Sequence, residues 1–200
     1  PHYEESLVDA SPLAIWCVMR MAKENNVTVL LDGRGADEIL GGYLHYFNPY
    51  FAELANNNKN KFIEELALYK KLRGTDFPVN MQFTMKRKYS KLLRTMGSLR
   101  RQFTTPGYLS FINPDLVSAY KNEPPPFATF NSLNESLKYS ATVYGLEKLL
   151  RYADRNSMAF SREVRTPFLS HELVEFVFSL PTVYKIHNGW TKYILRSSMN

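Results

Sequence analysis

One segment, residues 27–47, constrains the fold more than any other part of the chain. It reads VTVLLDGRGADEILGGYLHYF, so an apolar, β-branched run ends at the turn DGRG (residues 32–35) and a helical pattern begins at once. Glycine adopts positive φ readily and lets a ligand approach the backbone closely. The N–H groups at the start of a helix attract an anion. The segment therefore predicts a buried parallel strand, a glycine turn and a helix, with a nucleotide site where the strand ends.

Asp37 lies in the first turn of the predicted helix. Its carboxylate stands where a hard cation that bridges phosphate groups would sit, which makes Asp37 the candidate metal ligand. The alternative is a carboxylate that only complements the helix N-terminus. A glycine turn before a helix occurs in many folds, so this segment by itself leaves both interpretations open.

Residues 151–181 form a second block, RYADRNSMAFSREVRTPFLSHELVEFVFSLP, in which a charged helical pattern precedes an RTPFL turn and an apolar helix. Together the two blocks closely resemble the synthetase domain of glutamine-dependent asparagine synthetases. That family carries SG-x-GADE-x-x-GGY after a central strand, and later R-x-DR-x-SM, E-x-R-x-PFLD, LVEF and SLP. The matching residues outside LVEF and SLP are Gly33, Gly35, Ala36, Asp37, Glu38, Gly41, Gly42, Tyr43, Arg151, Asp154, Arg155, Ser157, Met158, Glu163, Arg165, Pro167, Phe168 and Leu169.

The resemblance implies a fold class: an α/β, helix-dominated fragment of a parallel-sheet domain of the adenine-nucleotide alpha-hydrolase-like (ATP pyrophosphatase) type. Residues 1–200 are then part of one synthetase domain, incomplete at both ends. The family's SGG-x-DS loop and the N-terminal cysteine nucleophile of its glutaminase domain do not occur in this sequence. We therefore expect a piece of a longer enzyme that is not catalytically competent alone.

The resemblance also implies an activity and its substrates. Asparagine synthetases activate the side-chain carboxylate of aspartate by attack on the α-phosphorus of ATP, which releases pyrophosphate and leaves an acyl-adenylate. Ammonia from the glutaminase domain then displaces AMP and gives asparagine. The expected cofactors are ATP and Mg²⁺, and the expected partners are aspartate or another carboxylate acceptor and glutamine-derived ammonia. A homodimer is compatible with this reading.

Site roles follow from the same resemblance. Asp37 is expected to hold Mg²⁺ on the pyrophosphate, and the turn residues Asp32, Gly33, Arg34 and Gly35 are expected to bind the nucleotide. The expected catalytic residues are Asp37, Arg34 and one further acid in the second block.

That further acid is Glu163. With Arg165 it stands just before the Pro-Phe-Leu turn, where both residues would line the acceptor side of the cleft. The alternative is a structural ion pair between Glu163 and Arg165 inside a helical core.

The turn departs from the family at two positions. Asp32 stands where the family has serine, and Arg34 stands where it commonly has glutamate, or glutamine or tyrosine in relatives. A fixed cation in place of an acid reverses the local field, so Arg34 either clamps a substrate carboxylate, contacts phosphates or pairs with Asp32 without a catalytic role. The departure leaves other acceptors open, namely a sugar carboxylate or the closure of a lactam or lasso-peptide ring. A degenerate, non-catalytic helical binding module is the alternative from another class.

The charge distribution and composition of the chain limit the kinds of partner that it is expected to bind. The net charge of +6 is concentrated in residues 86–101, within a stretch (77–114) that has no Asp or Glu. No base-reading motif accompanies it, so we interpret it as a solvated basic helix face and do not expect nucleic acid as a partner. The alternative is a surface that contacts the glutaminase domain. No apolar run is long enough to span a membrane, which predicts a cytoplasmic protein. Cys17 lies among apolar residues and is interpreted as a small buried hydrophobe.

Periodicity predicts mainly helices around the single strand at residues 27–31. Ser11 is expected to cap the first helix, and Ser170 is expected to cap the helix that follows the Pro-Phe-Leu turn. A loop-rich stretch is expected at residues 104–130. The predicted helices are 11–25, 36–47, 50–55, 61–73, 76–103, 131–144, 145–152 and 191–199.

Overall fold

The computed structural model describes residues 10–77, 113–115 and 130–199. The chain divides into two units, one of residues 1–75 and 129–200 and the other of residues 76–128. The helices and strands from Ser11 to Arg73 and from Leu133 to Ser198 lie in the first unit. The basic segment at 86–101, and nearly all of the helix and loop predicted for 76–130, lie outside the described residues.

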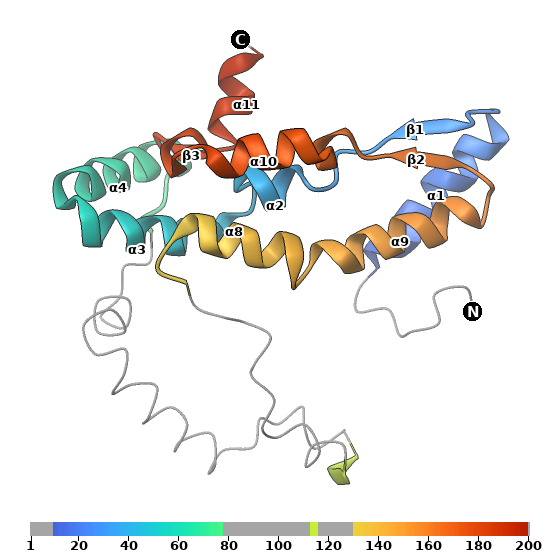
Figure 1. The fold of residues 1–200 in the computed structure, drawn as a ribbon, viewed down its shortest axis with the longest axis horizontal. Helices are drawn as coiled ribbons and strands as arrows, with labels where there is room; N and C mark the ends of the chain where they lie inside the picture. The colour runs from blue at the N-terminus through green and yellow to red at the C-terminus, as the bar shows by residue number, and fades with distance from the viewer. Residues whose placement is uncertain (1–9, 78–112, 116–129, 200) are drawn as a thin grey trace. The chain divides into compact units, whose positions relative to one another are not determined.

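Helices dominate the described part of the chain, as predicted (Figure 1). The first half contains α1 (Ser11–Glu24), β1 (Val29–Leu31), α2 (Ala36–Leu40), the 3₁₀ turn η1 (Leu44–Tyr46), α3 (Phe47–Asn57) and α4 (Lys59–Arg73). The second half contains α8 (Leu133–Thr142), α9 (Leu146–Met158), β2 (Glu163–Arg165), η3 (Pro167–Leu169), α10 (His171–Ser179), η4 (Thr182–Tyr184), β3 (Ile186–His187), β4 (Trp190–Thr191) and α11 (Tyr193–Ser198).

Strands β1 and β2 form a parallel pair that joins the two sequence blocks (Figure 1). Leu30 lies opposite Val164, and Asp32 N extends the ladder by donating to Arg165 O at 2.8 Å. The parallel position predicted for the first strand is confirmed. The prediction of a single strand is wrong, because the three-residue alternation of Glu163, Val164 and Arg165 is too short to stand out beside the long helical patterns around it.

The predicted burial of β1 is also wrong. Val29 is 40% exposed and Leu31 is 76% exposed, while Leu30 is partly buried. In the described part of the chain β1 has β2 as its one strand neighbour. Its fully apolar composition suits a strand covered on both faces, but the described residues cover only part of it.

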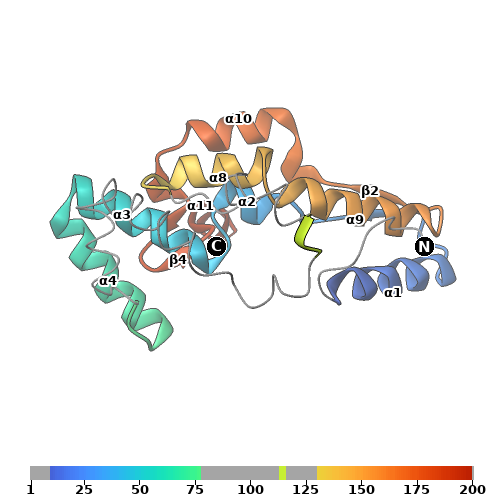
Figure 2. The same cartoon turned by 90° about the horizontal axis from the view of Figure 1, so that it is seen from below.

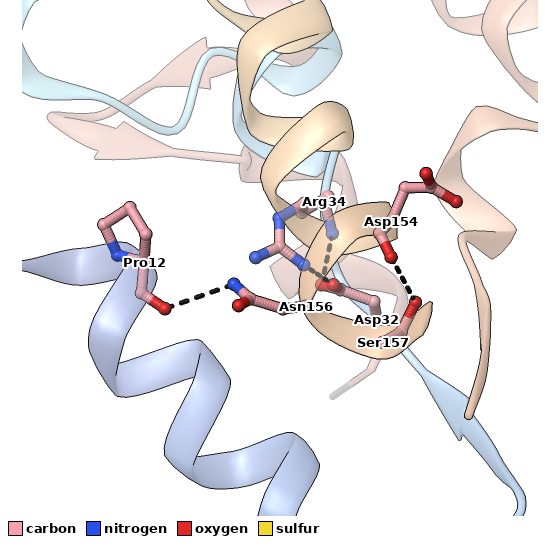
Figure 3. A network of polar contacts seen from close by, with 6 residues as sticks. All are labelled: Pro12, Asp32, Arg34, Asp154, Asn156 and Ser157. Carbon is pink, nitrogen blue, oxygen red and sulfur yellow. Dashed lines mark hydrogen bonds and ion pairs between the residues drawn. The ribbon is translucent and has the colours of Figure 1, made fainter. Parts of the chain in front are cut away.

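Helix α1 packs along α9, as Figures 1 and 2 show. The buried Asn156 on α9 donates from Nδ2 to the carbonyl oxygen of Pro12 at 3.1 Å (Figure 3). The helix N-cap is Ala10 without a side-chain hydrogen bond, so the predicted cap at Ser11 is off by one residue. Cys17 is exposed, which corrects the prediction of a buried thiol. The buried residues of α1 are Pro12, Met19 and Ala22, and helical spacing puts Cys17 on another face.

The helix predicted for residues 36–47 is broken at the glycine pair. Helix α2 ends at Leu40, Gly41 adopts a left-handed conformation with φ 69°, and Gly42 N donates to Asp37 O at 2.9 Å. This is a glycine-terminated helix end, and the chain resumes in η1 and α3. The single helix predicted for residues 36–47 is therefore wrong, since the two glycines end α2.

The other helices predicted within the described residues are confirmed within a few residues, except that α9 continues to Met158. Ser170 caps α10 as predicted, because its hydroxyl accepts from Leu173 N at 3.4 Å. One core cluster joins Ile39 and Leu40 of α2 to Val177 of α10. This packing holds α2, which has only five residues, against α10.

Candidate functional site

An open cleft of about 460 Å³ lies where β1 ends. The turn, α2, α9 and the residue before α11 all contribute to its walls. Its lining residues are Asp32, Gly33, Arg34, Asp37, Glu38, Tyr43, Leu149 and Lys192. The structure thus brings together four of the predicted site residues, and the turn lies at the carboxyl end of a parallel strand as the sequence predicts.

The glycine turn is built from local hydrogen bonds. Arg34 N donates to Asp32 Oδ1 at 3.1 Å and Ala36 N donates to Gly33 O at 3.3 Å. Gly35 adopts φ 90° as the N-cap of α2, and a Cβ there would overlap the side chain of Leu169. Gly33 differs, because a Cβ there would meet nothing within 4 Å. Gly35 is thus required by the fold, whereas the open space beside Gly33 is available to a ligand.

Replacing each of these two glycines by alanine should have a different effect on the protein. We expect Gly35→Ala to destabilise the protein by about 2–4 kcal/mol, because it combines a left-handed L-residue with an overlap against Leu169. We expect Gly33→Ala to change stability by less than about 1 kcal/mol and to weaken nucleotide binding instead. Urea unfolding and nucleotide titration of both variants test this. Equal loss of stability in the two variants would contradict it.

Arg34 is paired within the cleft wall. Its guanidinium forms an ion pair with the Asp32 carboxylate, and the two side chains are only 14% and 21% exposed (Figure 3). Burial lowers the pKa of Arg34, and the nearby Glu38 opposes this shift. The three expected roles for Arg34 are a clamp on a substrate carboxylate, a phosphate contact and a pair with Asp32. The structure has the pair with Asp32, so these two side chains together carry no net charge.

Asp37 faces a cation that sequence reasoning missed. Its Oδ1 lies 2.8 Å from Nζ of Lys192, and the side chains are 34% and 26% exposed, with Asp37 the more exposed. A Cβ at Gly42 would overlap Asp37 Oδ1 and would lie 2.5 Å from Lys192 Cε. The glycine after the break of α2 therefore makes room for this ion pair.

Tyr43 and Glu38 form the other polar contact of the cleft. The Tyr43 hydroxyl donates to Glu38 Oε1 at 2.8 Å, and Glu38 is only 3% exposed. Burial and this hydrogen bond raise the pKa of Tyr43, so the phenol keeps its proton at neutral pH. The Tyr43 ring, held by this hydrogen bond, therefore lines the cleft as an uncharged side chain.

The residues fit Mg²⁺ only in part. Among the described residues no group of three or more His, Cys, Asp or Glu side chains could hold a metal ion. Mg²⁺ is commonly bound by one or two carboxylates together with substrate phosphates and water, and Asp37 supplies one such carboxylate. The donor set therefore fits a metal that arrives with polyphosphate, and not an all-protein metal cage.

The cations of the cleft are the side chains of Arg34 and Lys192. Helix α2 has only five residues, so its dipole is smaller than the one inferred from a helix at 36–47. Both cations of the cleft are paired, Arg34 with Asp32 and Lys192 with Asp37, but Lys192 is the more exposed of the two and is better placed to meet a phosphate.

Glu163 lies outside the cleft lining. Its Oε1 is 2.7 Å from Nε of Arg165, and both side chains are more than half exposed on β2. The predicted ion pair exists, but on a strand surface and not in a helical core. A catalytic role for Glu163 stays a prediction.

Lys192 could not have been found from its own sequence signal. The preceding Asn188-Gly189 pair is a strong signal for a two-residue hairpin turn, and the structure has that hairpin between β3 and β4. The pairing of the following lysine with Asp37 depends on how the hairpin docks.

The fold is of the adenine-nucleotide alpha-hydrolase-like class: it is helix-dominated α/β, with a parallel strand pair and a charged cleft where β1 ends. The chain belongs to the asparagine synthase family, whose family model, described as asparagine synthase, matches residues 1–200.

Similar proteins are asparagine synthetases. The chain is 27% identical to asparagine synthetase [glutamine-hydrolyzing] 1 of Bacillus subtilis (strain 168), over 98% of this chain and 32% of that protein. It is 26% identical to a putative asparagine synthetase [glutamine-hydrolyzing] of Mycobacterium bovis, over 99% and 31%. A 63-residue stretch is 41% identical to asparagine synthetase [glutamine-hydrolyzing] 3 of Bacillus subtilis, over 32% and 10%.

The chain spans about a third of the length of the first two of these relatives. No solved structure matches it. Within the described residues, none of the helices combines the length and the apolar character needed to cross a membrane.

Proposed function

We propose that the complete protein is an ATP-dependent, amide-forming ligase that acts in the cytoplasm. In it, residues 1–200 supply the wall of the synthetase site that binds nucleotide and acceptor. The observation that carries this proposal is the meeting of the glycine turn, Asp37 and Lys192 in one cleft at the end of β1. Family membership supports it, because the asparagine synthase family is ATP-dependent.

The chemistry places distinct demands on these residues. An acceptor carboxylate oxygen attacks the α-phosphorus of ATP, the bond to pyrophosphate breaks, and ammonia then attacks the acyl carbon while AMP leaves. Such transfers depend mainly on positioning and on neutralising charge. The backbone beside Gly33 receives the nucleotide, and the ammonium of Lys192 stabilises negative charge that develops on phosphate oxygens. Mg²⁺, held by Asp37 together with phosphate oxygens, would neutralise the leaving pyrophosphate.

Aspartate is the first acceptor to test, because the relatives are named asparagine synthetases. The complete protein is incubated with ATP, Mg²⁺, ammonium and either aspartate or another carboxylate. We expect AMP and pyrophosphate in equal amounts that depend on aspartate. Formation of neither product with any carboxylate would contradict the ligase and favour the non-catalytic module.

One observation favours a second acceptor class. Arg34 takes a position where the family commonly has an acid, and its pair with Asp32 changes the charge of the wall. A sugar carboxylate or a ring-closing peptide substrate is therefore the alternative. Product formation with such a carboxylate, and not with aspartate, would establish it.

Arg34→Gln tests whether the glycine turn contributes to binding of the acceptor carboxylate. We expect the acceptor KM to rise about ten- to a hundredfold with little change in the ATP KM, because the unpaired Asp32 carboxylate would repel an anionic acceptor. Steady-state kinetics with each substrate varied separately measures both constants.

The double variant Asp32→Asn/Arg34→Gln separates two mechanisms. If Arg34 acts by neutralising Asp32, as the ion pair indicates, the double variant regains most of the lost affinity. If Arg34 instead clamps the acceptor directly, the double variant stays impaired. A rise in the ATP KM alone would assign Arg34 to phosphate contact.

A further inference from the structure

The hairpin β3–β4 directly precedes the lysine of the cleft. Ile186 pairs with Thr191 and His187 with Trp190. The two turn residues, Asn188 and Gly189, have φ of 52° and 74°, as a tight two-residue hairpin requires.

Lys192 follows the hairpin in a left-handed conformation, with φ 52°. This conformation costs free energy in a residue with a Cβ and persists only where neighbouring structure imposes it. The neighbours on both sides are held: Tyr193 N donates to Lys185 O at 2.9 Å, and Arg196 Nε donates to Thr191 O at 2.9 Å. The hairpin therefore fixes the position of the Lys192 backbone, from which the side chain extends.

Glu65 of α4 holds this hairpin in place. It is 1% exposed, and its carboxylate accepts from His187 Nδ1 at 2.8 Å, Asn188 N at 3.0 Å and Gly189 N at 3.3 Å. A Cβ at Gly189 would lie 3.0 Å from Tyr69 Cα, so the turn packs directly on the α4 backbone. A buried carboxylate that accepts from three donors of one hairpin is a specific anchor, because a shift of the hairpin would leave its oxygens unsatisfied.

We infer that Glu65 is a positioning residue for the cleft: by anchoring the hairpin to α4 it sets the place of the Lys192 ammonium beside Asp37. Glu65 does not line the cleft, so it acts through Lys192 alone. The kinetic consequence of this inference rests on the proposed function, whereas its structural consequence does not.

The structural consequence is tested by competitive acetylation of lysines, read by mass spectrometry on the complete protein without substrates. In Glu65→Gln we expect the acetylation rate of Lys192 to rise about threefold or more, because the hairpin no longer holds its amine in the ion pair with Asp37. Lys185, which is fully buried two residues before His187, reports general loosening and is expected to stay unlabelled. An unchanged rate at Lys192, or equal rises at both lysines, would overturn the inference.

Two further variants complete the test. His187→Gln removes one of the three donors and leaves Glu65 in place, so we expect a smaller rise at Lys192. Asn58→Ala is the control on the same helix: it removes the cap that accepts from Lys61 N and destabilises α4 without touching the hairpin. It is expected to leave the acetylation of Lys192 at the wild-type rate, and a rise there equal to that in Glu65→Gln would also overturn the inference.

Kinetics separate this inference from the proposed function. If Glu65 positions Lys192 for catalysis, Glu65→Gln lowers kcat for pyrophosphate release per folded molecule about tenfold, with a small change in the ATP KM. If Lys192 becomes more reactive to acetylation and pyrophosphate release keeps its wild-type rate, the positioning stands and the catalytic use of Lys192 is wrong.

Discussion

Asp37→Asn is expected to lower Mg²⁺-dependent pyrophosphate release about 1,000-fold or more in the complete protein, since the metal would lose its carboxylate while phosphoryl charge develops. Asparagine has the same shape, so the fit against Gly42 is preserved. The ion pair with Lys192 is partly exposed and its loss is worth under about 1 kcal/mol of stability. The variant is therefore expected to fold normally.

The measurement is a coupled pyrophosphate assay, with urea unfolding to confirm stability. Glutamine hydrolysis, if the complete protein carries that activity, should stay near wild type because Asp37 serves only the synthetase cleft. Glu172→Gln, at the exposed first turn of α10, is the matched control for loss of a carboxylate. Wild-type pyrophosphate release in Asp37→Asn would show that Asp37 is a helix N-terminal carboxylate and not a metal ligand.

Lys192→Met is expected to lower kcat about a hundredfold or more, because it removes the more exposed of the two cations that line the described cleft. Methionine keeps most of the length and apolar contact of the stem. The loss should therefore appear in kcat and only weakly in stability.

Lys192→Arg distinguishes charge from placement. A fixed positive charge is retained, but the planar guanidinium does not reproduce the compact ammonium beside Asp37, so partial activity is expected. Lys138→Met on α8 is the control for loss of an exposed lysine. Full activity in Lys192→Met would remove Lys192 from the mechanism and leave it as a structural partner of Asp37.

Local chain chemistry explains what was predictable. The strand at Val29–Leu31 follows from β-branched and apolar residues, and the left-handed Gly35 follows from a turn that must enter a helix at once. Ser170 caps α10 because a hydroxyl before a helical run satisfies a free N–H. These features depend on residues within a few positions of each other.

Errors arose where a local pattern had two solutions. The helix at 36–47 keeps its apolar spacing through Gly41 and Gly42, but glycine ends a helix as readily as it bends one. Glu163 and Arg165 alternate around Val164, a pattern too short to separate strand from helix. Only the pairing with β1 decides in favour of the strand.

The sequence by itself determined the family, the glycine turn after β1 and the presence of the Asp37 carboxylate beside that turn. Each of these depends on residue types at fixed short spacing. The tertiary structure alone decided that Arg34 is neutralised by Asp32 inside a wall and that Lys192 meets Asp37. It also decided that Glu65 anchors the hairpin which carries that lysine. The physical reason is that burial and ion pairing between distant segments depend on how helices and strands pack, and packing has no signature in the residues nearby.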